Sequence, residues 1–188
     1  NPYIFIDEGK PMRWLDAVVG GKAVGVPGVL KALDMAHKEF GELEWRVLFD
    51  DAITTARQGF TVSPRLERLL SLDIHPGLNN FVTTQNYFKP NGNIIKSGIN
   101  KKNTLLANTL FQIAAKGVDY FYSGELAEKI AEATRVAIIN PGFMTATDLE
   151  NYEAKKREPI CGNYRNKKIC GMAPPSSGGI TVYQILKA

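Results

Sequence analysis

The chain has 188 residues, which is within the size range of one domain, and its 44% hydrophobic and 22% charged content is typical of a globular protein. No window approaches 18 consecutive apolar residues, so the sequence predicts no membrane-spanning helix. The net charge of +4 comes from scattered lysines and arginines that acidic residues interrupt, which argues against a nucleic-acid-binding surface.

Neither a metal nor a cofactor is expected from the composition. The two histidines, His37 and His75, lie far apart, and neither has a second ligand at the spacing that metal sites use. The first residue is Asn1, no secretory leader precedes it, and the final helical pattern stops without a glycine or proline. We therefore expect a processed chain or a piece of a longer polypeptide, truncated at both ends.

Short strands followed by one helix are expected in the first 41 residues. Residues 3–6 predict a short strand or an ordered tail. Residues 17–26 hold too many glycines for a helix, and their valines suit a buried strand. Residues 27–40 then predict an amphipathic helix, because Pro27 suits a first helical position and Gly41 follows the last apolar residue of the stripe.

Two further helices are predicted before residue 73. An apolar stripe from Trp45 to Ala56 indicates the first, which Gly59 closes in a left-handed conformation. Ser63 and Pro64 open a shorter helix as its cap and first residue. Residues 73–103 are rich in Asn, Gly and Pro, and we expect a long connector with little regular structure, of the kind that is functional or packed against another part.

The next segment is again helical. A stripe beginning at Thr104 ends at Gly117. A second helix is expected after Ser123, which is predicted as its cap, with small and apolar residues through Ala137 facing inward. Residues 147–150 match a capping box and predict one more helix start. The region 27–137 is therefore expected to be mainly helical.

The last 31 residues, 158–188, predict a hairpin followed by a helix. The strands cover residues 160–164 and 168–172, Pro174 and Pro175 end the second, and residues 176–179 form a turn into the helix. The fold class is thus α+β, and residues 1–188 are interpreted as a single domain or a fragment of one.

The hairpin register decides whether the two cysteines can bond. A two-residue Arg165-Asn166 loop places Cys161 and Cys170 directly opposite each other, whereas a three-residue bulged loop puts them on opposite faces. Asn166 suits the left-handed position of the bulged loop better than Arg165 suits a position with positive φ. We therefore expect two free thiols.

Several residues resemble catalytic groups but are interpreted structurally. Ser176 and Ser177 could bind an anion through backbone N–H groups at a helix start, but no nucleophile elbow surrounds them, and a turn with a cap is favoured. The adjacent carboxylates Asp50-Asp51 point roughly 100° apart on a helix. Tyr122, Ser123 and Glu125, with Phe121, are expected at a helix start packed on the core. We assign no catalytic residue in this chain and no substrate-binding residue.

Four collinear segments resemble the gamma-glutamyltransferases, also called gamma-glutamyl transpeptidases or glutathione hydrolases. The resemblance runs from about Leu15 onward and is carried by VGVPGVLKALDMAHKEFGELEWRVLFDDAITTARQGFTVSPRL, LANTLFQIAAKGVDYFYSGELAEKI, FMTATDLENYEAKKREPICGNYR and PPSSGG. It implies a four-layer αββα N-terminal nucleophile hydrolase, made as a zymogen that cuts itself into two subunits. The new N-terminal threonine attacks the gamma-glutamyl carbonyl of substrates such as glutathione, and water or an amino acid resolves the acyl-enzyme.

The resemblance also implies what this chain lacks. It corresponds to the later two-thirds of the large subunit, so the threonine is expected downstream and the substrate-carboxylate arginine upstream. The chain alone is therefore predicted to be inactive, with the small subunit as its partner and a gamma-glutamyl compound as substrate. An exposed hairpin edge at 160–172 predicts self-association. The family resemblance suggests a periplasmic or secreted location.

Two departures and three alternatives accompany this interpretation. Asp51 stands where the family usually has proline, and Asn140-Pro141-Gly142 stands where it commonly has two glycines. A related acylase and a poly-gamma-glutamate transpeptidase are alternatives within the same enzyme class. A catalytically inactive binding or scaffold fragment is an alternative from a different class.

Overall fold

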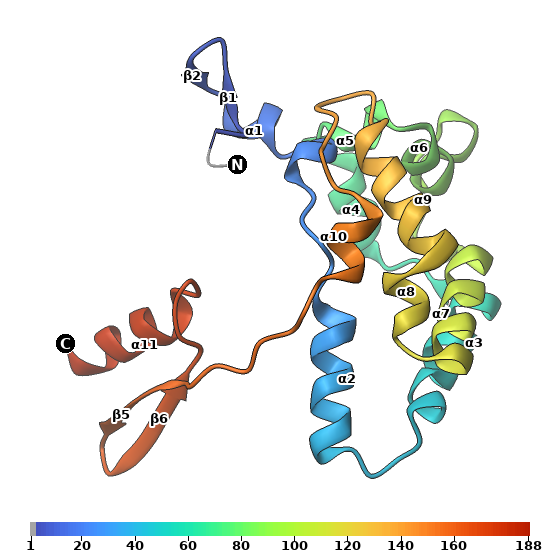
Figure 1. Ribbon diagram of the computed structural model, residues 1–188. Coiled ribbons are helices and arrows are strands. Elements are labelled where there is room, and N and C mark those ends of the chain that lie inside the picture. The colour runs from blue at the N-terminus through green and yellow to red at the C-terminus, as the bar shows by residue number, and fades with distance from the viewer. Residues whose placement is uncertain (1–2) are drawn as a thin grey trace. The chain divides into compact units, whose positions relative to one another are not determined.

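A computed structural model describes residues 3–188, which separate into two compact units (Figure 1). The first ends at Glu153, and the second is Ala154–Ala188. The first unit is helical, with short two-residue strands. Its elements are β1 (Ile6–Asp7), β2 (Lys10–Pro11), α1 (Trp14–Ala17), η1 (Gly21–Ala23), α2 (Val29–Phe40), η2 (Trp45–Phe49), α3 (Asp50–Gln58), β3 (Phe60–Thr61), α4 (Pro64–Ser71), α5 (Gly77–Asn80), α6 (Val82–Phe88), η3 (Pro90–Gly92), β4 (Asn100–Lys101), α7 (Thr104–Lys116), α8 (Asp119–Tyr122), α9 (Gly124–Arg135) and α10 (Ala146–Glu150).

The helix boundaries set by caps and glycines confirm the sequence predictions. Ser63 Oγ accepts a hydrogen bond from the Leu66 N–H at the start of α4. Gly59 and Gly117 end α3 and α7 with φ of 95° and 84°, a left-handed conformation that glycine adopts without a steric penalty. These signals are local, because each one involves residues within a single turn of the chain.

Four helix starts differ in detail from the prediction. Helix α2 begins at Val29, two residues after Pro27, with Gly28 at the cap position. The stripe from Trp45 does not form one helix, because a 3-10 turn, η2, precedes α3. The capping box lies two residues earlier than expected and pairs Thr145 with Asp148. Ser123 occupies the cap position of α9, but its hydroxyl donates to the carbonyl of Asp119 in the preceding helix. The hydroxyl of Ser123 therefore bonds to the end of α8 and accepts no hydrogen bond from the first amides of α9.

The predictions for residues 17–26 and 73–103 are wrong. Residues 17–26 form no strand but contain the end of α1 and the 3-10 turn η1, whose backbone packs against residues 134–142. Residues 73–103 contain α5, α6, η3 and β4 rather than an irregular connector. These elements are short, and their placement depends on contacts with distant segments, which the local composition does not reveal.

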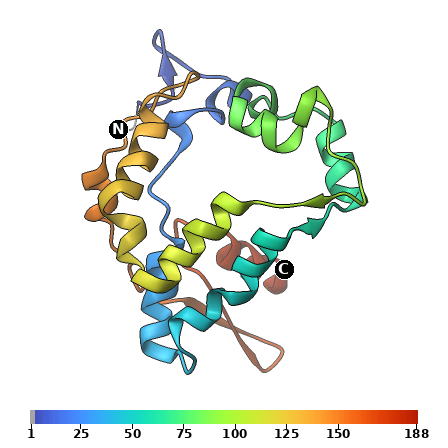
Figure 2. The ribbon, with the colours of Figure 1, turned by 90° about the vertical axis from the view of Figure 1, so that its right-hand side faces the viewer.

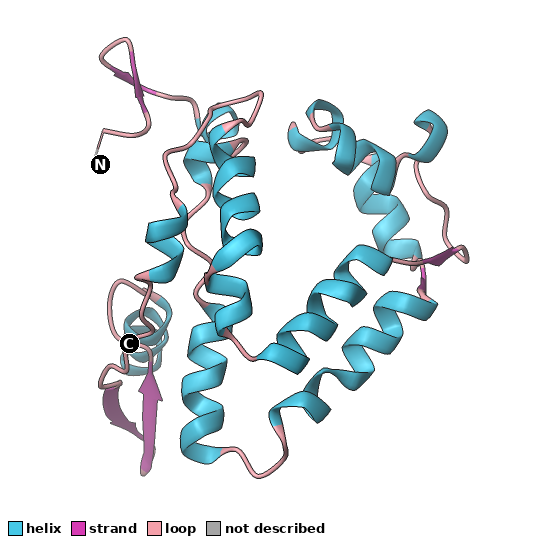
Figure 3. Ribbon diagram, turned by 45° about the vertical axis from the view of Figure 1, so that its right-hand side comes forward, coloured by secondary structure: helices cyan, strands magenta, loops and turns pink. Residues whose placement is uncertain are grey.

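Three apolar clusters hold the first unit together. One joins α8, α9 and α10, a second joins α3, η2 and α7, and a third joins α4 to residues 94–95. Figures 2 and 3 show α3 and α7 side by side, in agreement with their extensive contacts. The buried residues of the three clusters are Val118, Tyr122, Ala127, Ala131, Met144, Leu149, Phe49, Ile53, Ile113, Ala114, Val62, Leu70 and Ile95.

Tyr122 connects the first cluster to the start of α2. Its side chain is only 1% exposed, and its ring stacks on that of Tyr152. Its hydroxyl donates to the carbonyl of Pro27 and accepts from the N–H of Lys31, an amide in the first turn of α2. Tyr122 therefore belongs to the core, as expected from the sequence. Its hydroxyl also gives a hydrogen-bond partner to one backbone carbonyl and one backbone N–H at the start of α2.

The second unit consists of the strands β5 (Ile160–Tyr164) and β6 (Lys167–Gly171) and the helix α11 (Gly178–Lys187). Arg165 and Asn166 form a two-residue turn with φ of 45° and 62°, the positive values of a type I′ hairpin turn. Tyr183 of α11 lies against Gly162 of β5. A hairpin followed by a helix was predicted for this region, and β5 has the predicted bounds, whereas β6 lies one residue earlier than the predicted strand 168–172.

The prediction of two free thiols is wrong. The two-residue turn pairs Cys161 directly with Cys170, their Cα atoms are 4.1 Å apart, and the two residues form a disulfide. Two free thiols would have required Arg165 to avoid positive φ. The observed φ of Arg165 shows that pairing along the whole hairpin outweighs that single-residue preference.

Candidate functional site

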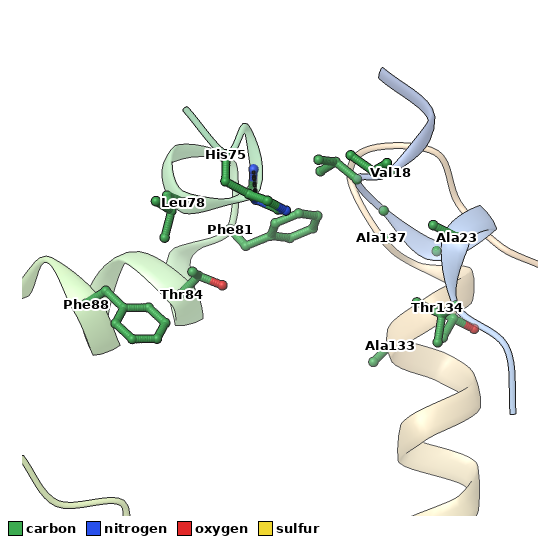
Figure 4. Close-up of a pocket in the computed structure, with 15 residues that line it drawn as sticks. Val18, Ala23, His75, Leu78, Phe81, Thr84, Phe88, Ala133, Thr134 and Ala137 are labelled. Carbon is green, nitrogen blue, oxygen red and sulfur yellow. Dashed lines mark hydrogen bonds between the residues drawn. The ribbon is translucent and has the colours of Figure 1, made fainter. Parts of the chain in front are cut away.

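An apolar pocket of about 560 Å³ lies in the first unit, and Figure 4 shows its two walls. One wall comes from α5, α6 and the preceding loop, and the other from η1 and the end of α9. The lining residues are Val18, Val19, Gly20, Gly21, Ala23, Val24, His75, Gly77, Leu78, Phe81, Thr84, Phe88, Ala133, Thr134 and Ala137.

Two polar side chains of this pocket, His75 and Thr134, make hydrogen bonds to nearby backbone groups. His75 Nδ1 accepts a hydrogen bond from the Gly77 N–H at 3.1 Å, so the ring is held over the start of α5. The buried hydroxyl of Thr134 donates to the Ala131 carbonyl at 2.8 Å. The pocket therefore offers apolar contact surface and no arrangement of a nucleophile with an adjacent base.

Sequence reasoning did not find this pocket. One wall lies in residues 73–103, which were expected to be irregular, and the other lies in the wrongly predicted strand. A signal was present, since Leu78, Phe81 and Phe88 follow at intervals of three and seven residues, a helical spacing. The intervening Asn and Gln residues obscured it.

Close contact between backbone segments explains why η1 can form one wall of the pocket. A Cβ atom added to Gly21 would lie 1.9 Å from the carbonyl oxygen of Thr134 and 2.4 Å from the nitrogen of Gly142. Gly142 in turn donates its N–H to the Thr134 carbonyl at 2.8 Å. The close approach of three backbone segments thus requires glycine at this position.

The two departures from the family pattern have physical explanations. Asn140 has φ of 44°, a left-handed conformation that asparagine tolerates better than most residues. Its side-chain amide also donates to the carbonyls of Asp16 and Val19, which adds contacts that glycine cannot make. Asp51 is exposed in the first turn of α3, where a carboxylate interacts favourably with the helix dipole. Asp50 lies beside it in the same turn.

The serines of the second unit lie at the start of α11 without acting as side-chain caps. Ser177 occupies the cap position, but its backbone is helical and its side chain makes no capping hydrogen bond, so that part of the prediction is wrong. Ser176 donates its N–H to the Ala173 carbonyl in a turn, as expected. Helical φ and ψ at Ser177 direct its side chain away from the amides that a cap would bind.

The glycines next to these serines have a packing role. A Cβ added to Gly179 would lie 2.7 Å from the Met172 carbonyl oxygen, and one added to Gly171 would lie 2.5 Å from the Cα of Gly179. Glycine at both positions therefore lets the first turn of α11 lie directly against β6. This contact accounts for the second glycine of PPSSGG without invoking a ligand.

The groups with shifted pKa values make structural contacts and do not line the pocket. The N–H of Thr145 lowers the pKa of Asp148 in the capping box, and the Lys31 ammonium lowers the pKa of Asp119. Burial raises the pKa of the Tyr122 hydroxyl. Glu125 pairs with Lys129 one turn along α9, and that hydrogen bond lowers its pKa.

The described residues show neither a metal-ligand cluster nor a membrane-length helix. No group of three His, Cys, Asp or Glu side chains among them is arranged to hold a metal ion. His37 Nε2 lies 2.7 Å from the Leu43 carbonyl oxygen, so its ring is engaged in a turn. Across residues 3–188, no helix is both long and apolar enough to cross a membrane.

Comparison with known proteins gives concordant matches over nearly the whole chain. The family model described as gamma-glutamyltranspeptidase matches residues 4–188. The glutathione hydrolase proenzyme of Bacillus subtilis (strain 168) is 37% identical over 188 residues, which is 100% of this chain and 31% of that protein. The acylase ACY 1 proenzyme of Pseudomonas sp. (strain SE83) is 36% identical over 186 residues, covering 96% of this chain and 32% of that protein.

The structural comparison agrees with the sequence matches. The crystal structure of Helicobacter pylori gamma-glutamyltranspeptidase superimposes with a TM-score of 0.88 at 33% identity, covering 97% of this chain and 51% of that chain. This chain therefore spans about a third of the length of the curated relatives it matches.

Proposed function

Because this chain belongs to the gamma-glutamyltranspeptidase family, we propose that it is a large-subunit portion of an enzyme that cleaves gamma-glutamyl amide bonds. The substrates are glutathione and related compounds, and the acceptor of the gamma-glutamyl group is water or an amino acid. The observation that carries the proposal is the collinear match over residues 4–188, supported by structural similarity at a TM-score of 0.88.

The proposed chemistry takes place on residues outside this chain. In an N-terminal nucleophile hydrolase, the threonine freed by self-cleavage attacks the amide carbonyl, and its own α-amino group serves as the base. The helices described here then form part of an outer layer of a four-layer αββα sandwich and support the sheets that carry the nucleophile. In this proposal the chain contributes the scaffold, and no residue of it is catalytic.

An assay of two polypeptides tests the proposal. The chain of 188 residues is expected to release no product from a chromogenic gamma-glutamyl anilide above the buffer rate. The full-length gene product is expected to cut itself into two subunits and to release the product. A rate from the isolated chain, free of contaminating enzyme, would contradict the assignment of catalysis to the missing part. A full-length product that neither cuts itself nor turns over would favour the inactive scaffold.

A related acylase is the second candidate, because a 36% identical relative has that name. The two activities differ in what they recognise, since a gamma-glutamyl donor carries an α-carboxylate and an α-ammonium group, whereas the donor of an acylase need not carry both. Competition therefore separates them. Free glutamate analogues are expected to inhibit the full-length enzyme if the donor is gamma-glutamyl, and to leave an acylase unaffected.

The partner proposed for the hairpin is the small subunit. Within the described residues, β5 and β6 pair only with each other, so both outer edges lack a neighbouring strand. Met172, Val182 and Ile185 are also 51–69% exposed, an apolar surface that strands of a second subunit would cover.

Without that partner, the isolated chain is expected to self-associate through the same unit. Burial of an apolar side chain contributes roughly 1.5–3 kcal/mol, so a few such contacts stabilise a dimer. Added salt is expected to strengthen the association, because it screens the repulsion between lysine-rich copies. Light scattering over a concentration series measures the effect. A monomer at high micromolar concentration, with slow amide exchange throughout residues 160–172, would show that the hairpin needs no partner.

A further inference from the structure

The disulfide between Cys161 and Cys170 lies on the exposed face of the hairpin, and we propose that it is a thiol-exchange site for small anionic thiols. Side chains alternate between the two faces of a strand. Gly162 and Ile169, which pair with each other, are half-buried on the α11 side, where Gly162 meets Tyr183. Cys161 and Cys170 therefore face the other way, and both are exposed.

The exposure matters because exchange requires a direct approach to sulfur. A thiolate must attack one sulfur of the disulfide, so a buried bond is protected and an exposed one reacts. The register pairs Cys161 directly with Cys170 across the two strands, and three residue pairs lie between this pair and the turn. The site is therefore open to small molecules in solution while the strands remain paired.

Charge favours an anionic attacking thiol. Residues 154–188 contain seven basic side chains and one acidic side chain, a net charge of +6, whereas the whole chain carries +4. Lys168 precedes Cys170 by two residues and is exposed on the same face, at a spacing of roughly 7 Å along the strand. Its ammonium group attracts an anionic thiol and stabilises the cysteine thiolate that leaves.

The exchange balances in two steps. In the first, an external thiolate attacks one cysteine sulfur, a mixed disulfide forms, and the other cysteine leaves as a thiolate that takes a proton from water. In the second, another external thiolate attacks the mixed disulfide and releases the small-molecule disulfide together with the second cysteine thiolate. Two external thiols are oxidised, and the protein disulfide is reduced to two thiols.

The proposal is independent of the gamma-glutamyl activity, so the isolated chain is tested at a concentration at which light scattering shows it to be a monomer. The oxidised chain is mixed with glutathione, a tripeptide with a net negative charge, or with the cationic thiol cysteamine. Mixed disulfides are trapped by acid and measured by intact mass. At low ionic strength the rate per thiolate is expected to be at least threefold higher for glutathione, and 0.5 M salt is expected to reduce that ratio.

A matched pair of variants tests the role of the lysine. Lys168→Gln is expected to slow exchange with glutathione roughly threefold. Lys167→Gln removes the same charge from the neighbouring residue on the opposite face, and it is expected to change the rate by less than about 1.5-fold. Circular dichroism confirms that each variant remains folded.

Three results would overturn the proposal. The first is the absence of a mixed disulfide after exposure to glutathione. The second is an equal rate per thiolate for glutathione and cysteamine at low salt. The third is an equal effect of the two lysine substitutions, which would mean that only the net charge of the unit matters.

Discussion

Replacing Gly21 with alanine is expected to destabilise the first unit by about 3 kcal/mol. The added methyl group would lie 1.9 Å from the Thr134 carbonyl oxygen and 2.4 Å from the Gly142 nitrogen. Both neighbours are backbone atoms, so no side-chain rotation relieves the overlap. The turn η1 must instead move away from α9, which opens the wall of the apolar pocket. Urea unfolding followed by circular dichroism measures the loss.

Gly25 provides the control for this experiment. It lies four residues further along the same segment, has no positive φ, and has no atom within 4 Å of an added Cβ. Gly25→Ala is therefore expected to change the free energy of unfolding by less than about 0.5 kcal/mol. Equal unfolding midpoints for the two variants would show that η1 does not pack closely against α9.

Replacing Gly179 with alanine is expected to loosen the contact between β6 and α11 by about 2 kcal/mol. The new Cβ would lie 2.7 Å from the Met172 carbonyl oxygen and 2.9 Å from the Gly171 carbonyl carbon. Amide exchange in β6 and α11 of the intact chain is expected to accelerate at least tenfold, because about 1.4 kcal/mol corresponds to a factor of ten in the opening equilibrium. Exchange in α7, within the first unit, serves as an internal reference.

The neighbouring glycine provides the matched variant. An added Cβ at Gly178 meets no atom within 4 Å, and the residue begins α11, where alanine has the higher helix propensity. Gly178→Ala is therefore expected to leave exchange unchanged or to slow it. Faster exchange in this variant than in Gly179→Ala would show that these glycines act through chain flexibility rather than through contact with β6.

The sequence by itself determined those features that depend on neighbouring residues. The end of α2 follows from Gly41, the start of α4 from Ser63 and the end of α7 from Gly117, because caps and stops act within one turn of a helix. Collinear motifs also identified the family, which the match over residues 4–188 confirms. That identification depends on the order of many residues and needs no knowledge of their contacts.

The tertiary structure alone decided the features that depend on distant residues. The segment 17–26 has the composition of a strand, yet it turns at Gly20 and Gly21 because residues 134–142 lie directly against it. The apolar pocket exists only because that turn lies opposite α5 and α6. The disulfide depended on pairing along the entire hairpin, whose ladder outweighs the backbone preference of Arg165. In the first two cases contacts between segments far apart in sequence decide the structure, and in the third the pairing of two neighbouring strands does. Each outweighs a local preference of about 1 kcal/mol, and a local pattern cannot show which contacts will form.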